Sequence, residues 1–313
     1  NGRISIHALR TFGDQSLEFL RDYHTTNSDI GKVCRHLGNS WDPMNKTAVE
    51  FLRIASQKNP NRNARGYATL ALGQMLKGRA EGVAFFPFSI PSTNQWWLQA
   101  QAAYQEEIKK NGTNAPSAEA QRAFETVLAQ YGDCPTQPRH SLRNPKATLG
   151  EEAQVELYAL NHLEPGKVAP EISGKDVEGQ SLKLSQYRGE VVVLSFWASW
   201  CGPCMQMIPL ERALAERLKD QPFTMLGVNG DDNIADAKRA MQKERITWPS
   251  FWTQGGPNGV IADTWNIHGW PTVFVIDPTG VIRLKFEGYG GMTSNLLNKA
   301  VDQLLKEPSG PKK

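Results

Sequence analysis

Two cysteines separated by two residues lie where an apolar segment gives way to an amphipathic one. Cys201 and Cys204 follow the run Val191-Val192-Val193-Leu194, and leucines then recur every four residues at Leu210, Leu214 and Leu218. A short apolar run followed by a period near four predicts a buried strand that leads into a helix. The sequence therefore predicts a β–α unit with Cys201 at the junction and Cys204 inside the first turn.

The start of a helix is well suited to thiol chemistry. Its free N–H groups and the positive end of its dipole stabilise a thiolate, and such a site can lower a cysteine pKa from ~8.5 to ~7 or below. Cys201 can therefore attack a disulfide, and Cys204 can release the product by closing a small disulfide ring. Half of a zinc site is an alternative, but the only other cysteines are Cys34 and Cys134, and His268 is the only histidine downstream. The strand–helix context favours redox chemistry.

Several motifs, in order along the chain, resemble one known family. Residues 196–204, Phe-Trp-Ala-Ser-Trp-Cys-Gly-Pro-Cys, resemble the thioredoxin active site. Further segments resemble the TlpA/redoxin (AhpC/TSA-like) branch of thioredoxin-fold proteins: 166–170, 177–179, 184–189, 269–272 and 274–280. The resemblance spans about residues 163–307. It implies a thioredoxin-like α/β domain, with a central mixed sheet flanked by helices, and a thiol–disulfide oxidoreductase activity.

The resemblance also implies a substrate-binding surface. Gly269-Trp270-Pro271-Thr272 resembles the loop in which a cis-proline faces the active-site disulfide and exposes backbone groups to an extended substrate. Trp200 and Trp270 would flank Cys201 as an apolar surface, together with Gly202 and Pro203 of the motif itself. No bound cofactor and no metal are expected, because the Cys201–Cys204 disulfide carries the electrons. The expected partners are protein disulfides or dithiols and a second redox partner that recycles the pair.

Two positions depart from the related patterns. Many thioredoxins have a buried aspartate where this chain has Ser195, and many TlpA-like proteins have a glutamate where it has Met207. Either carboxylate could accept the proton that Cys204 loses when it resolves a mixed disulfide. Neither serine nor methionine titrates near neutral pH, so the sequence leaves the general base unidentified.

Three other functions compete with this interpretation. The redoxin branch includes peroxide-reducing peroxiredoxins, but their pattern has a threonine three residues before the cysteine, where this chain has Ala198. A partner-binding helical module with a vestigial redox domain is a second alternative; intact Cys201, Cys204 and Pro271 oppose it, and the missing carboxylates favour it. A copper or zinc site that combines both cysteines with His268 suits the ligand chemistry, but a surface histidine is the favoured interpretation.

The 313 residues fit about two domains. Residues 1–162 are predicted to be an all-α helical bundle. A plain helical domain without a ligand is the favoured interpretation, and a docking surface for a partner protein at Trp96-Trp97 is the alternative. Segments 61–77 and 117–131 of this bundle resemble tetratricopeptide helices, but the ~34-residue period of that repeat is not visible. Helical periodicity ends at Leu163-Glu164-Pro165-Gly166. Strands and helices alternate in residues 163–313, as in an α/β fold.

Capping residues, prolines, glycines and apolar patterns predict the individual helices and strands. Asp42-Pro43 predicts a helix start, and Pro60 its end. Further helices are expected from 64 to before Gly78, over 97–108, from Ser117 to before Gly132, and after a capping box of Thr148 and Glu151, with an apolar loop over 82–92. The α/β part predicts a strand at 223–228, a helix at 234–244, a hairpin of 273–276 with 281–286, and a closing helix at 296–305. Whether Cys34 and Cys134 pair is left open.

Composition excludes some partners and leaves the compartment open. The net charge is only +3 and the pI about 8.6, and no strongly basic run precedes Lys312-Lys313, so nothing favours nucleic acid. No apolar run approaches the ~18 residues of a membrane span. The sequence begins at Asn1 without a methionine or a signal-peptide pattern, so information on targeting is expected to be missing from it rather than absent from the protein. A redox pair occurs in reducing and oxidising compartments alike, whereas the resemblance implies a bacterial cell envelope or periplasm.

The position of Cys201 leads to a first prediction. Because Cys201 lies at the start of the helix and Cys204 inside its first turn, Cys201 should be the more acidic and more accessible thiol. Iodoacetamide is expected to alkylate Cys201 of the reduced protein well before Cys204 near neutral pH, as peptide mass mapping can measure. Faster labelling of Cys204, or equally slow labelling of both, would contradict the assigned roles.

Overall fold

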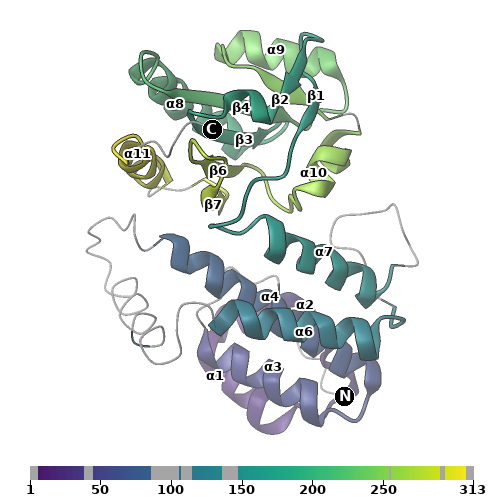
Figure 1. Ribbon diagram of the computed structural model, residues 1–313. Coiled ribbons are helices and arrows are strands. Elements are labelled where there is room, and N and C mark those ends of the chain that lie inside the picture. The colour runs from purple at the N-terminus through teal and green to yellow at the C-terminus, as the bar shows by residue number, and fades with distance from the viewer. Residues whose placement is uncertain are drawn as a thin grey trace. The chain divides into compact units, whose positions relative to one another are not determined.

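The computed structural model describes residues 6–38, 45–85, 106, 115–135, 147–253, 255–289 and 293–307. Most of the described residues up to Leu160 form a helical unit, and the residues from Asn161 onward form an α/β unit. In Figure 1 the helical unit contains the purple to teal helices α1 to α7, and the α/β unit runs from the teal strands β1 and β2 through green to the yellow helix α11. Among the described helices, none is long and apolar enough to cross a membrane.

The helical unit is built from helices that share one core. Its described elements are α1 Ile6–Tyr23, η1 Ser28–Ile30, α2 Gly31–Gly38, α3 Lys46–Lys58, α4 Arg62–Phe85, α6 Ala115–Tyr131 and α7 Leu149–His162. Phe51, Phe124 and Leu149 are fully buried in that core. Gly73 lets α4 approach α6, since a Cβ at this position would lie only 2.6 Å from the Phe124 ring.

Part of the predicted helix pattern is confirmed. The helix before Pro60 ends at Lys58, α6 ends at Tyr131 before Gly132, and the capping box forms. In that box Glu151 N–H donates to Thr148 Oγ1 at 3.2 Å, and Thr148 N–H donates to Glu151 Oε2 at 3.0 Å. The predicted third helix and the proposed contact at Trp96-Trp97 lie outside the described residues.

Three predicted helix boundaries are wrong. Helix α3 begins at Lys46, because the Asn45 side chain accepts the Ala48 N–H at 2.9 Å and caps the helix in place of Asp42. Helix α4 continues through Gly78 to Phe85, across the predicted helix end and into the predicted loop. A glycine lowers helix propensity by only ~1 kcal/mol, and the neighbouring buried side chains outweigh that preference. Helix α6 begins at Ala115, two residues before Ser117.

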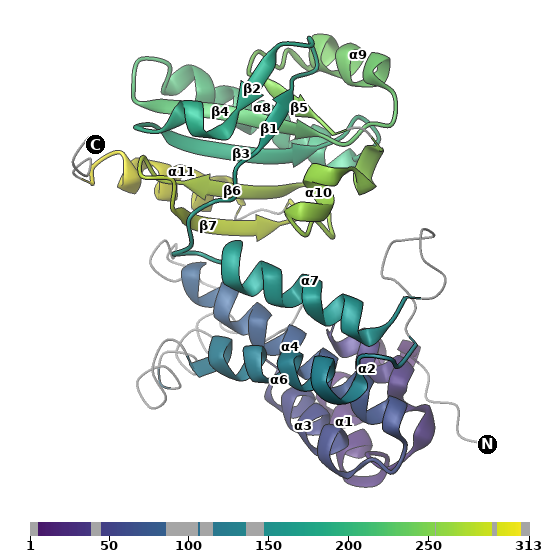
Figure 2. The same cartoon turned by 45° about the vertical axis from the view of Figure 1, so that its right-hand side comes forward.

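The α/β unit has the mixed sheet that the resemblance implies. Its elements are β1 Ser173–Lys175, β2 Ser181–Lys183, η3 Leu184–Tyr187, β3 Val191–Trp197, α8 Gly202–Arg217, β4 Phe223–Asn229, α9 Ile234–Glu244, β5 Ser250–Trp252, η4 Gly256–Asn258, α10 Val260–Thr264, β6 Thr272–Ile276, β7 Ile282–Glu287 and α11 Thr293–Leu304. The sheet order is β5-β4-β3-β6-β7, with β3 parallel to β4 and antiparallel to β6, as Figure 2 shows. The fold class is confirmed, and so are the predicted strand, helices and hairpin of this part. The sequence did not predict β5 or α10.

Strand β3 is the centre of this unit, and all seven of its residues are buried. Successive side chains of a strand point to opposite faces. Val193 and Trp197 join one apolar cluster with side chains of α8, α9 and α11. On the other face, Phe196 lies against the rings of Trp265 and Phe274, with centroids 5.9 Å away in each case. Covered on both faces, β3 holds the chain that leads into Cys201.

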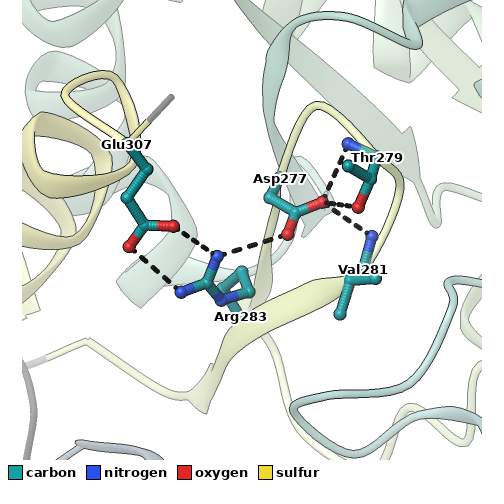
Figure 3. A network of polar contacts seen from close by, with 5 residues as sticks. All are labelled: Asp277, Thr279, Val281, Arg283 and Glu307. Atoms are coloured by element: carbon teal, nitrogen blue, oxygen red, sulfur yellow. Dashed lines mark hydrogen bonds and ion pairs between the residues drawn. The ribbon is translucent and has the colours of Figure 1, made fainter. Parts of the chain in front are cut away.

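A polar network connects the β6–β7 hairpin to Glu307, which follows α11 (Figure 3). Arg283 donates to Glu307 at 2.8 and 3.1 Å and to Asp277 Oδ2 at 3.3 Å. Asp277 also accepts the backbone N–H of Thr279 at 2.9 Å and that of Val281 at 3.0 Å. Burial by itself raises the pKa of Asp277, but these hydrogen bonds outweigh it and lower that pKa. The network fixes the turn at 278–280.

The complete sheet and core of the second unit lead to a prediction about its autonomy. A fragment of residues 161–313 is expected to fold and unfold cooperatively without the helical unit, because β3 keeps both neighbouring strands and its covering helices. Near-ultraviolet circular dichroism during urea unfolding would measure this, with the full chain as the control. An unfolded fragment beside a folded full chain would show that the helical unit is required for the α/β fold.

Candidate active site

The two cysteines lie at the junction of β3 and α8, as the sequence predicts. Cys201 is the N-cap of α8, Gly202 and Pro203 are exposed in its first turn, and Cys204 follows them. The Cys201 and Cys204 sulfurs are bonded to each other at 2.06 Å. Cys201 Sγ also accepts the backbone N–H of Cys204 at 3.1 Å. Cys201 is 4% exposed and Cys204 is 1% exposed, so both sulfurs are buried in the disulfide form.

A buried carboxylate at the end of β4 holds the loop that precedes Cys201. Asp231 accepts the Ser199 backbone N–H at 3.1 Å and the Ser199 hydroxyl at 2.7 Å, and Asn229 Nδ2 donates to it at 2.8 Å. Asp231 was not predicted from the sequence. Asn229-Gly230-Asp231 follows the predicted strand 223–228, and the carboxyl ends of neighbouring parallel strands meet at one edge of a sheet, but this signal can be used only once the strand order is known.

The loop before β6 brings two tryptophans together beside this junction. The peptide bond between Trp270 and Pro271 is cis, which confirms that expectation. Thr272 pairs with Phe196, so Pro271 comes next to the end of β3. The rings of Trp200 and Trp270 meet edge to face with centroids 5.7 Å apart, and Trp200 is 54% exposed. Binding of substrate by Trp200, Gly202, Pro203, Trp270 and Pro271 stays a prediction.

A second buried carboxylate lies on the active-site helix itself. Glu211 is one turn beyond Met207 on α8 and is only 2% exposed. Burial raises the pKa of this carboxyl from its ordinary value of 4.5 to about 7, while the nearby Ser195 hydroxyl lowers it. Within the described chain, neither Glu211 Oε1 nor Ser195 Oγ has a partner at hydrogen-bonding geometry. Glu211 was not predicted from the sequence, because a carboxylate was expected at position 195 or 207, although Glu211 interrupts an apolar helix face.

Cys34, Cys134 and His268 were the other candidates for disulfide or metal chemistry. Cys34 and Cys134 are buried and not bonded to each other, which settles the pairing that the sequence left open. Burial raises the pKa of both thiols. His268 is partly exposed. Among the described residues, no three His, Cys, Asp or Glu side chains gather as a metal site would need. The absence of a metal stays an expectation.

Comparison with known proteins identifies the family. The sequence pattern of the AhpC/TSA family matches residues 165–285. The thioredoxin-like protein YneN of Bacillus subtilis (strain 168) is 30% identical over 128 residues, which cover 39% of this chain and 70% of that protein. The chain belongs to the AhpC/TSA family. As a thioredoxin-like member with a bonded Cys201–Cys204 pair, it is a thiol–disulfide oxidoreductase.

Other similar proteins have related names. The thiol-disulfide oxidoreductase ResA of Bacillus thuringiensis subsp. konkukian (strain 97-27) is 28% identical over 126 residues, 40% of this chain and 71% of that protein. Among solved structures, a putative thiol:disulfide interchange protein DsbE from Chlorobium tepidum is 30% identical, with a TM-score of 0.42; the match covers 45% of this chain and 98% of that one. Each of these matches covers less than half of this chain.

The raised pKa of Glu211 predicts a stability that depends on pH. The folded state holds this proton more tightly than the unfolded state, so the associated stability is complete below about pH 4.5 and is lost as pH rises through about 7. The rise from 4.5 to about 7 corresponds to about 3 kcal/mol. Between about pH 4 and about pH 8, the free energy of unfolding of the oxidised wild type should therefore fall by about 3 kcal/mol relative to Glu211→Gln.

Urea unfolding of both proteins across this pH range would measure the difference. Glu216→Gln is the matched control, because Glu216 lies on the same helix with a side chain that is 74% exposed. A free-energy difference between wild type and Glu211→Gln that does not change with pH would contradict the raised pKa.

Proposed function

We propose that this chain exchanges dithiols and disulfides with protein substrates through Cys201-Gly202-Pro203-Cys204, without a bound cofactor. The observation that carries the proposal is the position of the bonded pair at the start of α8. The hydrogen bond from Cys204 N–H to Cys201 Sγ provides a donor to the sulfur that must become a thiolate on reduction. A hydrogen bond donated to a thiolate stabilises the charged form and so lowers the pKa of the thiol. Cys201 is therefore assigned the attack and Cys204 the resolution.

The exchange takes place in two balanced steps. The Cys201 thiolate attacks one sulfur of a substrate disulfide, forms a Cys201–substrate disulfide and releases the other sulfur as a thiolate. Cys204 then loses its proton and attacks the Cys201 sulfur, so that the Cys201–Cys204 bond forms and the second substrate sulfur leaves as a thiolate. Two electrons pass from the cysteine pair to the substrate. A dithiol protein that reduces Cys201–Cys204 completes the cycle.

The surroundings of Cys201 support a protein as the substrate. The exposed Trp200 ring and the Trp270 ring beside it form an apolar surface, and aromatic side chains of this kind are enriched in protein interfaces. Pro271 follows in the same loop, next to the end of β3. The proposal also includes docking of a partner protein on the helical unit and a location in the bacterial cell envelope, both of which rest on resemblance.

Reaction with a small chromogenic disulfide tests the chemistry. Reduced protein is mixed with excess dithiobis(nitrobenzoate), which releases one coloured thiolate at each step. Wild type is expected to release two equivalents per active site, Cys204→Ser only one, and Cys201→Ser none at the fast rate. Because Cys34 and Cys134 also contain thiols, the counts are taken in the Cys34→Ala/Cys134→Ala background.

Two results would contradict the proposal. Release of only one equivalent by the pair would show that the two cysteines do not act in sequence. Fast consumption of hydrogen peroxide by the reduced protein, with Cys201 oxidised ahead of any disulfide substrate, would favour the peroxidase alternative instead.

A further inference from the structure

The second step of the proposed exchange needs an acceptor for the proton of a buried thiol. Cys204 is 1% exposed, and burial raises the pKa of a thiol because it disfavours the charged form. Ser195 and Met207, where related proteins have carboxylates, cannot take up this proton near neutral pH. An acceptor on the buried side of the disulfide must therefore come from elsewhere in the chain.

Glu211 lies on the same side of α8 as Cys204. The two residues are seven positions apart, with Met207 between them, and helix positions separated by three, four and seven residues share a face. All three residues are buried. Seven residues correspond to about 10 Å along the helix axis, and helix side chains lean toward the N-terminus. The carboxyl of Glu211 therefore extends from its own turn toward the turn of Met207 and Cys204.

Ser195 supplies a polar group on the facing strand. Along β3, Ser195 is two residues from Val193 and two from Trp197, so these three side chains point to the same face of the strand. Val193 and Trp197 share an apolar cluster with Cys204 and Met207. Ser195 thus points to the face that α8 covers. Its hydroxyl is close enough to Glu211 to act on the carboxyl, and it has no hydrogen-bond partner at proper geometry in the described chain. A buried carboxylate oxygen and a buried hydroxyl without such partners are unusual.

We propose that Glu211 is the proton acceptor for Cys204 during resolution, and that the hydroxyl of Ser195 passes the proton between them. When Cys204 attacks the Cys201 sulfur, its proton moves to Ser195 Oγ, and the Ser195 proton moves to the Glu211 carboxylate. The Cys201–Cys204 bond forms and the substrate leaves as a thiolate. Glu211 later releases the proton to solvent. The inference rests on the proposed function, since it assigns a role within the second step.

The other charged side chains on α8 have their own partners. On α8 itself, Arg212 donates to the backbone carbonyl of Glu244 in α9, Glu216 pairs with Lys219, and Arg217 pairs with Asp302 of α11. Burial raises the pKa of Glu211, and the Ser195 hydroxyl lowers it. Near the start of α8, the other titratable groups are the reduced thiols of Cys201 and Cys204 and the carboxyl group of Asp231, which accepts hydrogen bonds from Ser199 and Asn229.

The proposal predicts a specific pH dependence of resolution. With a pKa of about 7, Glu211 is a neutral acid at lower pH and can accept a proton only above that value, so the rate of resolution should rise through about pH 7 and then level off. In Glu211→Gln the rise should move to the higher pH at which the buried thiol itself ionises. A well-placed general base contributes ~100-fold or more, so resolution by Glu211→Gln should be about 100-fold slower just above neutrality.

Stopped-flow release of the two nitrobenzoate thiolates separates the two steps in the full-length protein. The first release reports attack by Cys201 and should be the same in wild type and Glu211→Gln. The second release reports resolution, and in Glu211→Gln its rate should no longer rise near pH 7. Glu216→Gln is the matched control, and its profile should follow wild type. Ser195→Ala should slow resolution and move the rise to higher pH, because the hydroxyl that lowers the Glu211 pKa is gone; a purely structural role would not move this profile.

The possible outcomes distinguish the two proposals. Absence of the first release in wild type would overturn the proposed function. A normal first release, with the same second-step pH profile in wild type and folded Glu211→Gln, would overturn the role of Glu211 alone. Where Glu211→Gln fails to fold, as near-ultraviolet circular dichroism would show, Ser195→Ala decides: an unshifted profile overturns the proposal, and a profile moved to higher pH supports it.

Discussion

The pairing of β3 with β4 on one side and β6 on the other positions the reactive groups of this protein. Strand β3 leads to Cys201, β4 leads to Asp231, and β6 begins directly after Pro271. Because β3 runs parallel to β4 and antiparallel to β6, the end of β3, the end of β4 and the start of β6 meet at one edge. Backbone hydrogen bonds of the sheet therefore bring together three segments that are distant in the sequence. The helix dipole at Cys201 acts on a thiol that this pairing has already positioned.

The same interior places opposite demands on its polar groups. A sulfur that attacks needs donors and access, whereas a sulfur that resolves is protected from unwanted reactions when it is buried. Burial makes ionisation of Cys204 unfavourable, and it does the same to Glu211. A carboxyl with an ordinary pKa would be a weak base toward a thiol, so the environment that destabilises the charged Glu211 also makes it a better proton acceptor. The loss of stability above neutral pH and the basicity of Glu211 therefore have the same physical cause, which is burial of its carboxyl group.

Local signals were sufficient to predict most of the α/β unit. The strand–helix junction at Cys201, the cis bond at Pro271 and the hairpin turn at 278–280 each depend on a few neighbouring residues, and all three are present. The boundaries in the helical unit depend instead on tertiary packing, which extends α4 through Gly78 against its local propensity. Strand β5 has only three residues and α10 only five, too few for hydrophobic periodicity to indicate them.

The carboxylates of the site could not be predicted in the same way, because their effect depends on position in space. Asp231 acts on the loop before Cys201 across two parallel strands, and a sequence shows that relation only once the strand order is known. Glu211 was missed because the expectation was tied to two sequence positions, Ser195 and Met207. A titratable group can approach a buried thiol from several positions on a strand and on one helix face. If Glu211 has the proposed role, a carboxylate on another turn of the same helix face replaces one at position 195 or 207.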